Sequence, residues 1–120
     1  IISKRIKYLW KIGSFAITFI YEKQFSKNMK DVESIRKHIN RSDMVIITAL
    51  AERMSLMPEI GRYKKENNIP VTDENREVEI MKTLKKVAKE HELDESFVEE
   101  VFLSVFNEAK RIQNEVMTKS

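Results

Sequence analysis

The sequence contains no cysteine, and only two glycines and two prolines occur in its 120 residues. Without cysteine the chain has no disulfide framework, no thiolate nucleophile and no cysteine-based zinc or iron–sulfur site. Tight turns between strands depend on glycine and proline, so their scarcity argues against a β-sandwich or barrel and favours a mostly helical protein. The length suits one globular domain with a core of its own.

Histidine is almost as scarce as cysteine. His38 and His91 are the only two, and neither lies in an HExxH pattern or a comparable metal-ligand spacing. No serine or threonine is part of a recognisable nucleophile motif with histidine and aspartate. We therefore expect neither a metal site nor nucleophilic catalysis.

The net charge of +3 is unevenly distributed along the chain. Residues 1–30 contain seven lysines and arginines against one glutamate, whereas the remaining ninety residues contain 15 basic and 18 acidic side chains. This contrast predicts two parts, a basic N-terminal extension over 1–30 and a main domain over 31–120. A short basic stretch beside an acidic body is a weak nucleic-acid footprint, so we expect no nucleic-acid partner.

The basic extension has the pattern of an amphipathic helix, with apolar residues at helical spacing and lysines grouped opposite them. Its apolar run is about half of the roughly 20 residues that a membrane-spanning helix needs, and no small-x-small cleavage site follows Tyr21. Two interpretations come first: an added helix that covers the main domain, and upstream sequence that is absent from a product starting at Met29. A membrane-surface or targeting role is the alternative.

Three helices are predicted in the main domain. The first spans about 31–67, with a kink at Pro58, and ends before Pro70. A cap at Thr72 or Asp73 opens the second, which runs to about residue 91, and Asp94 opens the third, which runs to about residue 116. The predicted fold class is all-α, a three-helix chain with one long kinked N-terminal helix.

The length of the first helix predicts a partner. About 35 residues at 1.5 Å each give roughly 50 Å, whereas a compact chain of this size is only roughly 35 Å across. One chain cannot bury an apolar stripe of that length, so we expect a helical homodimer.

Polar side chains interrupt the apolar stripe of every predicted helix. On a helical wheel, the inward-facing polar residues are Arg53, Lys64, Asp73, Glu77 and Gln113. Burying an unpaired charge is costly, so such positions imply a partner. Two explanations remain open: a ligand site, or a buried salt-bridge network in which Glu77 pairs with Arg53 or Lys64.

Residues 31–116 resemble the AroQ-type, all-helical chorismate mutases. The resemblance rests on the segments IRKHIN, ALAERMSLMPEIGRYKKENNIPVTDENRE and HELDESFVEEVF and on the late Gln113. It implies an intertwined homodimer and a cytoplasmic enzyme of aromatic amino-acid biosynthesis, which converts chorismate to prephenate in the shikimate pathway. This intramolecular Claisen rearrangement needs no nucleophile, metal or cofactor. An isochorismate-pyruvate lyase of the same fold and a non-catalytic helical dimerisation module are the alternatives.

The resemblance also implies the site. Lys64, Gln113 and Arg53 would be catalytic, and the substrate-binding set would comprise Arg36, Arg53, Lys64, Asp73, Arg76, Glu77, Ala109 and Gln113. Arg36 and Arg53 are roughly 25 Å apart along one helix, so Arg36 would act in trans, across the dimer. Ala109 departs from the serine that many relatives carry near a substrate carboxylate.

Overall fold

The computed structural model describes residues 31–119, and every regular element in that range is helical. The helices are α3 (Val32–Ser55), α4 (Met57–Glu66), α5 (Glu74–Glu90) and α6 (Glu95–Thr118). The predicted all-α class is confirmed. The amphipathic helix predicted for residues 1–30 lies outside the described residues.

The long N-terminal helix is interrupted, as the proline predicted, but the interruption precedes the proline. α3 ends at Ser55 and α4 begins at Met57, which places Pro58 in the first turn of α4. An amide there would have no partner within the helix, so the missing donor of proline costs little. The predicted kinked helix is therefore two helices, α3 and α4, separated at Leu56.

Aspartates cap the starts of three helices. The Ser34 amide donates to Asp31 Oδ1 at 2.7 Å, the Arg76 amide to Asp73 Oδ1 at 3.1 Å, and the Phe97 amide to Asp94 Oδ2 at 2.9 Å. The bond from Ser34 lowers the pKa of the Asp31 carboxyl. Each cap satisfies an amide that the helix itself leaves unpaired, so the starts predicted at Asp73 and Asp94 are confirmed.

Two residues in left-handed conformation follow the ends of α4 and α5. They are Asn68, with φ 54°, and Glu92, with φ 60°. The amide after each one folds back onto the preceding helix: Ile69 donates to the Lys64 carbonyl at 2.8 Å, and Leu93 donates to that of Ala88 at 2.9 Å. These closures turn the chain sharply between successive helices.

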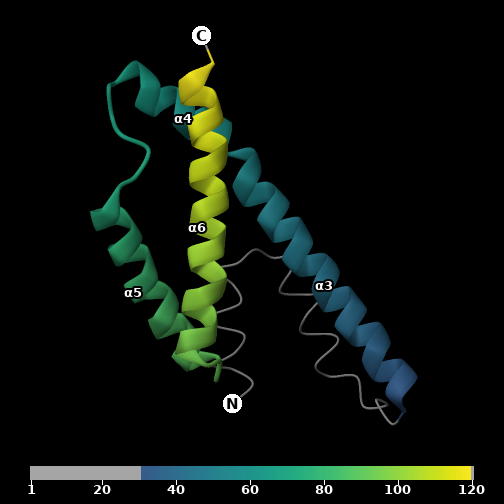
Figure 1. Cartoon of the computed structure of the whole chain (residues 1–120). Helices are drawn as coiled ribbons and strands as arrows, with labels where there is room; N and C mark the ends of the chain where they lie inside the picture. The colour runs from purple at the N-terminus through teal and green to yellow at the C-terminus, as the bar shows by residue number, and fades with distance from the viewer. Residues whose placement is uncertain (1–30, 120) are drawn as a thin grey trace. The chain divides into compact units, whose positions relative to one another are not determined.

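The chain divides between Ala49 and Leu50 into two units. In the C-terminal unit, α6 packs against both α4 and α5, and Figure 1 shows α5 and α6 running antiparallel. The buried apolar residues of the described chain all lie on α5 and α6: Ala88, Val98, Val105, Phe106 and Ala109. The core of this unit is therefore built around α6.

Gly61 sets the separation of α4 and α6. A Cβ atom at this position would lie 3.2 Å from the Cα atom of Gln113 and 3.3 Å from the Cβ atom of Val116. Both distances are shorter than ordinary van der Waals contact, so glycine lets the two backbones approach closely. The approach brings position 64, one turn further along α4, towards Gln113.

In contrast to α6, α3 has no buried residue. Ile35, Ile39 and Ile46 are 42%, 53% and 57% exposed. The apolar stripe predicted for this helix therefore remains uncovered along its N-terminal part. Among the described residues, no helix combines the length and the apolar character required to cross a membrane.

Candidate active site

A cavity of about 200 Å³ lies in the C-terminal unit. Side chains from the end of α3, from α4, from the connection to α5, and from α5 and α6 surround it. The lining residues are Arg53, Met57, Ile60, Lys64, Val71, Asp73, Arg76, Glu77, Ile80, Phe106, Ala109, Lys110 and Gln113. Seven of the eight residues predicted for the site are among them. The eighth, Arg36, belongs to the N-terminal unit and does not line this cavity.

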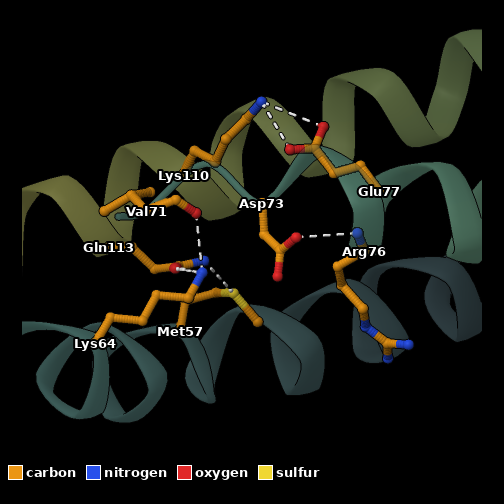
Figure 2. Close-up of polar contacts among 8 residues, drawn as sticks. All are labelled: Met57, Lys64, Val71, Asp73, Arg76, Glu77, Lys110 and Gln113. Carbon is orange, nitrogen blue, oxygen red and sulfur yellow. Dashed lines mark hydrogen bonds and ion pairs between the residues drawn. The ribbon is translucent and has the colours of Figure 1, made fainter. Parts of the chain in front are cut away.

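Lys64 is held by two acceptors. Its Nζ atom donates to the main-chain oxygen of Val71 at 2.9 Å and to Oε1 of Gln113 at 2.8 Å (Figure 2). An ammonium group has three protons to donate, so one remains for a ligand. The bond to Val71 also ties α4 to the connection that leads into α5.

Gln113 is the buried polar residue of the described core, at 5% exposure. Lysine only donates hydrogen bonds, so its bond to Oε1 fixes the orientation of the amide and leaves Nε2 as the donor end. Nε2 contacts Sδ of Met57 at 3.4 Å. Sulfur is a weak acceptor, and a ligand oxygen would replace it favourably.

Arg53 carries a donor that is left unsatisfied. Its guanidinium lies over the ring of Phe106, 5.7 Å from the ring centroid, and its Nη1 atom is buried with no hydrogen-bond partner among residues 31–119. Burial, followed by the nearby charge of Arg76, lowers the pKa of the Arg53 guanidinium. Both observations describe a cation without a counter-ion in the part of the chain that the structure describes, and an anionic ligand in the cavity would supply one.

Asp73 and Arg76 line the cavity at the start of α5. One oxygen of Asp73 accepts the capping bond from the Arg76 amide, and the other is not needed for the cap. The Arg76 guanidinium lies 3.6 Å from Glu79, in a pair that is more than half exposed. Such a surface pair is weak, so the Arg76 side chain can turn towards a ligand at little cost.

Glu77 pairs with a residue that the sequence did not predict for the site. The two carboxylate oxygens of Glu77 lie 3.3 and 3.2 Å from Nζ of Lys110 (Figure 2). The predicted alternative of a salt bridge from Glu77 to Arg53 or Lys64 is wrong for the described residues. Lys64 donates to Val71 and Gln113 instead, and the Arg53 guanidinium lies over the ring of Phe106. A signal for Lys110 was present: it follows Phe106 by four residues and precedes Gln113 by three, so all three share one face of α6.

Ala109 contributes a buried methyl group, 5% exposed, to the cavity wall. It offers no hydrogen bond where a serine would. The lining side chains comprise four cations, Arg53, Lys64, Arg76 and Lys110, and two acids, Asp73 and Glu77. The excess of positive charge suits a small ligand with two negative charges.

A larger hollow of about 630 Å³ lies between α4 and the end of α6, lined in part by Arg62 and Lys65. The Lys65 ammonium is already engaged there, because it donates to the main-chain oxygens of Val116 and Lys119 at the end of α6. No unsatisfied buried donor is found among its described lining residues. The smaller cavity is therefore the better candidate for an anion site.

The known proteins that this chain resembles are named for activity on chorismate or on 4-amino-4-deoxychorismate. The chain is 29% identical over 92 residues to a chorismate mutase of Methanocaldococcus jannaschii, a match that covers 77% of this chain and 93% of that protein. It is 31% identical to a bifunctional chorismate mutase/prephenate dehydratase of Buchnera aphidicola, over 78% of this chain and 24% of the relative. A 4-amino-4-deoxychorismate mutase of Streptomyces pristinaespiralis is 20% identical, over 70% of this chain and 65% of that protein.

No solved structure matches the chain. Residues 35–114 match the family described as chorismate mutase type II. The matched range covers more than half of the sequence and includes every residue that lines the cavity. The chain therefore belongs to the type II chorismate mutase family.

Proposed function

We propose that the cavity binds chorismate and converts it to prephenate, a step of phenylalanine and tyrosine biosynthesis. The observation that carries this proposal is the buried Nη1 atom of Arg53, which has no hydrogen-bond partner among the described residues. It lies in the wall of a cavity that also contains the donors of Lys64 and Gln113. A carboxylate accepts such bonds in pairs from a guanidinium, so a dicarboxylate fits this end of the cavity.

The rearrangement requires restraint of a flexible substrate. Both ends of the reacting system belong to one molecule, which must adopt a compact chair before the new carbon–carbon bond forms. Fixing that conformation through the carboxylates removes a large part of the entropic barrier. Arg53 supplies one fixed point, and its lowered pKa indicates that a bound carboxylate relieves an under-solvated charge.

Charge also develops during the reaction. As the carbon–oxygen bond of the ether lengthens, negative charge builds on the ether oxygen. The Lys64 ammonium has one N–H that is not used by Val71 or Gln113, and the Nε2 donor of Gln113 contacts only the sulfur of Met57. Donors that are held in place in this way stabilise the transition state more than the ground state, because the oxygen accepts more strongly once it is charged.

We assign the two acids at the start of α5 to the hydroxyl group on the ring of chorismate. Asp73 and Glu77 line the cavity and can accept a hydrogen bond from the ring hydroxyl. Arg76, beside them, offers a further donor to a carboxylate. Ala109 offers none, so this part of the wall contributes shape alone.

The second carboxylate is assigned to Arg36 of a partner subunit. Arg36 and Arg53 lie on one helix, α3, and 17 residues of helix span roughly 25 Å. That distance is too long for both side chains of one chain to reach one small ligand. The exposed isoleucines of α3 support the homodimer that this assignment requires, since pairing would remove them from water. A cytoplasmic location belongs to the same proposal.

The deciding experiment presents the purified protein with chorismate and, separately, with isochorismate. We expect prephenate from the first and no product from the second. Salicylate and pyruvate from isochorismate would identify the protein as a lyase instead. No product from either compound would leave a helical dimerisation module as the function. 4-Amino-4-deoxychorismate, for which the Streptomyces relative is named, completes the panel.

A further inference from the structure

We infer that Lys110 determines which ring substituent the cavity accepts: paired with Glu77, it selects a neutral hydroxyl over a positively charged amino group. The inference rests on the proposed function, since it assumes that the ring hydroxyl of chorismate is directed to Glu77. It concerns a residue of α6 that is four positions from Phe106 and outside the motifs on which the family resemblance rests.

The geometry of the pair allows Glu77 to bind a ligand and Lys110 at once. The Lys110 ammonium lies 3.2 to 3.3 Å from both carboxylate oxygens, and the side chains are 26% and 27% exposed. A carboxylate has about four lone-pair sites, so acceptors remain on Glu77 after Lys110 has bound. Both residues line the cavity, and Figure 2 shows the pair beside Asp73.

The charge of the pair sets its preference. An unpaired glutamate in a cavity attracts a cation, and an ammonium group on the ring would be bound well. Lys110 cancels that attraction and places a like charge within a few ångströms of the same position, where repulsion is strong because water is partly excluded. Binding of a neutral hydroxyl is little affected by the Lys110 charge, since the hydroxyl needs only one acceptor on Glu77.

The charge of the whole cavity points in the same direction. Its described lining carries two more cations than acids, which matches the two carboxylates of chorismate. 4-Amino-4-deoxychorismate has the same carboxylates and one aliphatic amine, which is cationic at neutral pH, so it carries one negative charge fewer overall than chorismate. Removing the Lys110 charge makes the cavity less positive by one, which matches the smaller negative charge of the amino compound. The variant cavity therefore suits the amino compound better than the natural one does.

The test measures kcat/KM for both compounds with the wild-type chain and Lys110→Met. We expect the ratio of the amino compound to chorismate to rise by at least about tenfold in the variant. Lys110→Arg should keep the wild-type ratio, because the charge is retained. Lys85→Met is the matched control: Lys85 joins α5 to α6 through Glu99 at 3.2 Å, yet neither residue lines the cavity.

A second variant separates charge from packing. Lys110→Gln retains a hydrogen-bond donor without the charge, so it should shift the ratio as Lys110→Met does, and circular dichroism confirms that each variant is folded. A ratio in Lys110→Met and Lys110→Gln equal to that of Lys85→Met would overturn the inference. Failure of the wild-type chain to produce prephenate would instead overturn the proposed function on which it rests.

Discussion

Single side chains in the cavity differ in how much the surrounding structure constrains them. Lys64 has two acceptors, Val71 and Gln113, on different parts of the chain, whereas Arg53 has a buried nitrogen with no partner among the described residues. The first arrangement fixes a donor before a ligand arrives, and the second reserves a donor for the ligand. Substitutions at the two positions should therefore affect different steps, transition-state stabilisation for Lys64 and binding for Arg53.

Loss of the Lys64 ammonium should reduce turnover while the fold remains intact. In Lys64→Ala we expect kcat to fall by on the order of 10²–10³-fold, as when other fixed donors to a developing oxyanion are removed. Far-ultraviolet circular dichroism should show unchanged helicity. Lys65→Ala is the matched control, since this neighbouring lysine binds the end of α6 and does not line the cavity. Near-normal turnover in Lys64→Ala would remove this residue from the mechanism.

Replacing Gln113 with glutamate should create a pH dependence that the natural side chain does not have. A glutamine amide donates at every pH, but a glutamic acid donates only when protonated, and the reference pKa of that group is about 4.3. The activity of Gln113→Glu should therefore be low at neutral pH and rise as the pH falls. The pH–rate profile of the variant, compared with that of the wild-type chain, provides the measurement. Identical profiles would show that position 113 does not donate to the substrate.

At the scale of elements, the helix ends were predictable and the helix contacts were not. Asp73 and Asp94 mark the starts of α5 and α6 because a cap is a local interaction over three residues. The pairing of Glu77 with Lys110 joins positions 33 residues apart and depends on how α5 packs against α6. A helical wheel identifies Glu77 as inward-facing but does not single out Lys110, and a wheel gives no information about which residues of two helices meet.

The contact between α4 and α6 can be tested at its closest point. Ala at position 61 would improve helix propensity by about 1 kcal/mol, but its methyl group would press on the backbone of Gln113 and on Val116. Overpacking of this kind costs about 1–3 kcal/mol. We expect Gly61→Ala to be less stable by about 1 kcal/mol in urea denaturation and several-fold slower in turnover, because Lys64 and Gln113 are moved apart.

The control for this substitution is Tyr63→Ala on the same helix, where the side chain is 58% exposed. It should leave turnover close to that of the wild-type chain. Normal turnover in Gly61→Ala would mean that the helices separate without disturbing the two donors, and that the close approach is not required for the geometry of the site.

For the whole molecule, the described chain accounts for one end of the proposed site. Seven of the eight predicted residues surround the cavity, and the remaining one, Arg36, lies on a part of α3 whose isoleucines are exposed. The exposure of these isoleucines was predictable from the length of the first predicted helix, because its apolar stripe is longer than one small chain can cover. The position of a second chain depends on contacts between copies, which a single sequence does not specify.

Subunit exchange provides the test of a shared site. Arg36→Ala and Arg53→Ala should each be inactive, yet a hybrid of the two should have one site in which both arginines are intact. After complete exchange of an equal mixture, we expect about one quarter of the wild-type activity, since half of the dimers are hybrids with one good site each. Native mass spectrometry confirms that hybrids have formed. Hybrids without activity would contradict the assignment of Arg36 to the partner's site.

The hydrogen bond from Lys64 to the main-chain oxygen of Val71 has a consequence for which substitutions the chain can accept. Every amino acid provides the same carbonyl group, so a codon change at position 71 leaves this anchor in place as long as the backbone keeps its path. A change of side chain at position 71 therefore leaves the hydrogen bond from Lys64 intact. Gln113, whose own side chain accepts the other bond, has no such freedom. We therefore expect the hydrogen bonds of Lys64 to tolerate substitution at position 71 better than substitution at position 113.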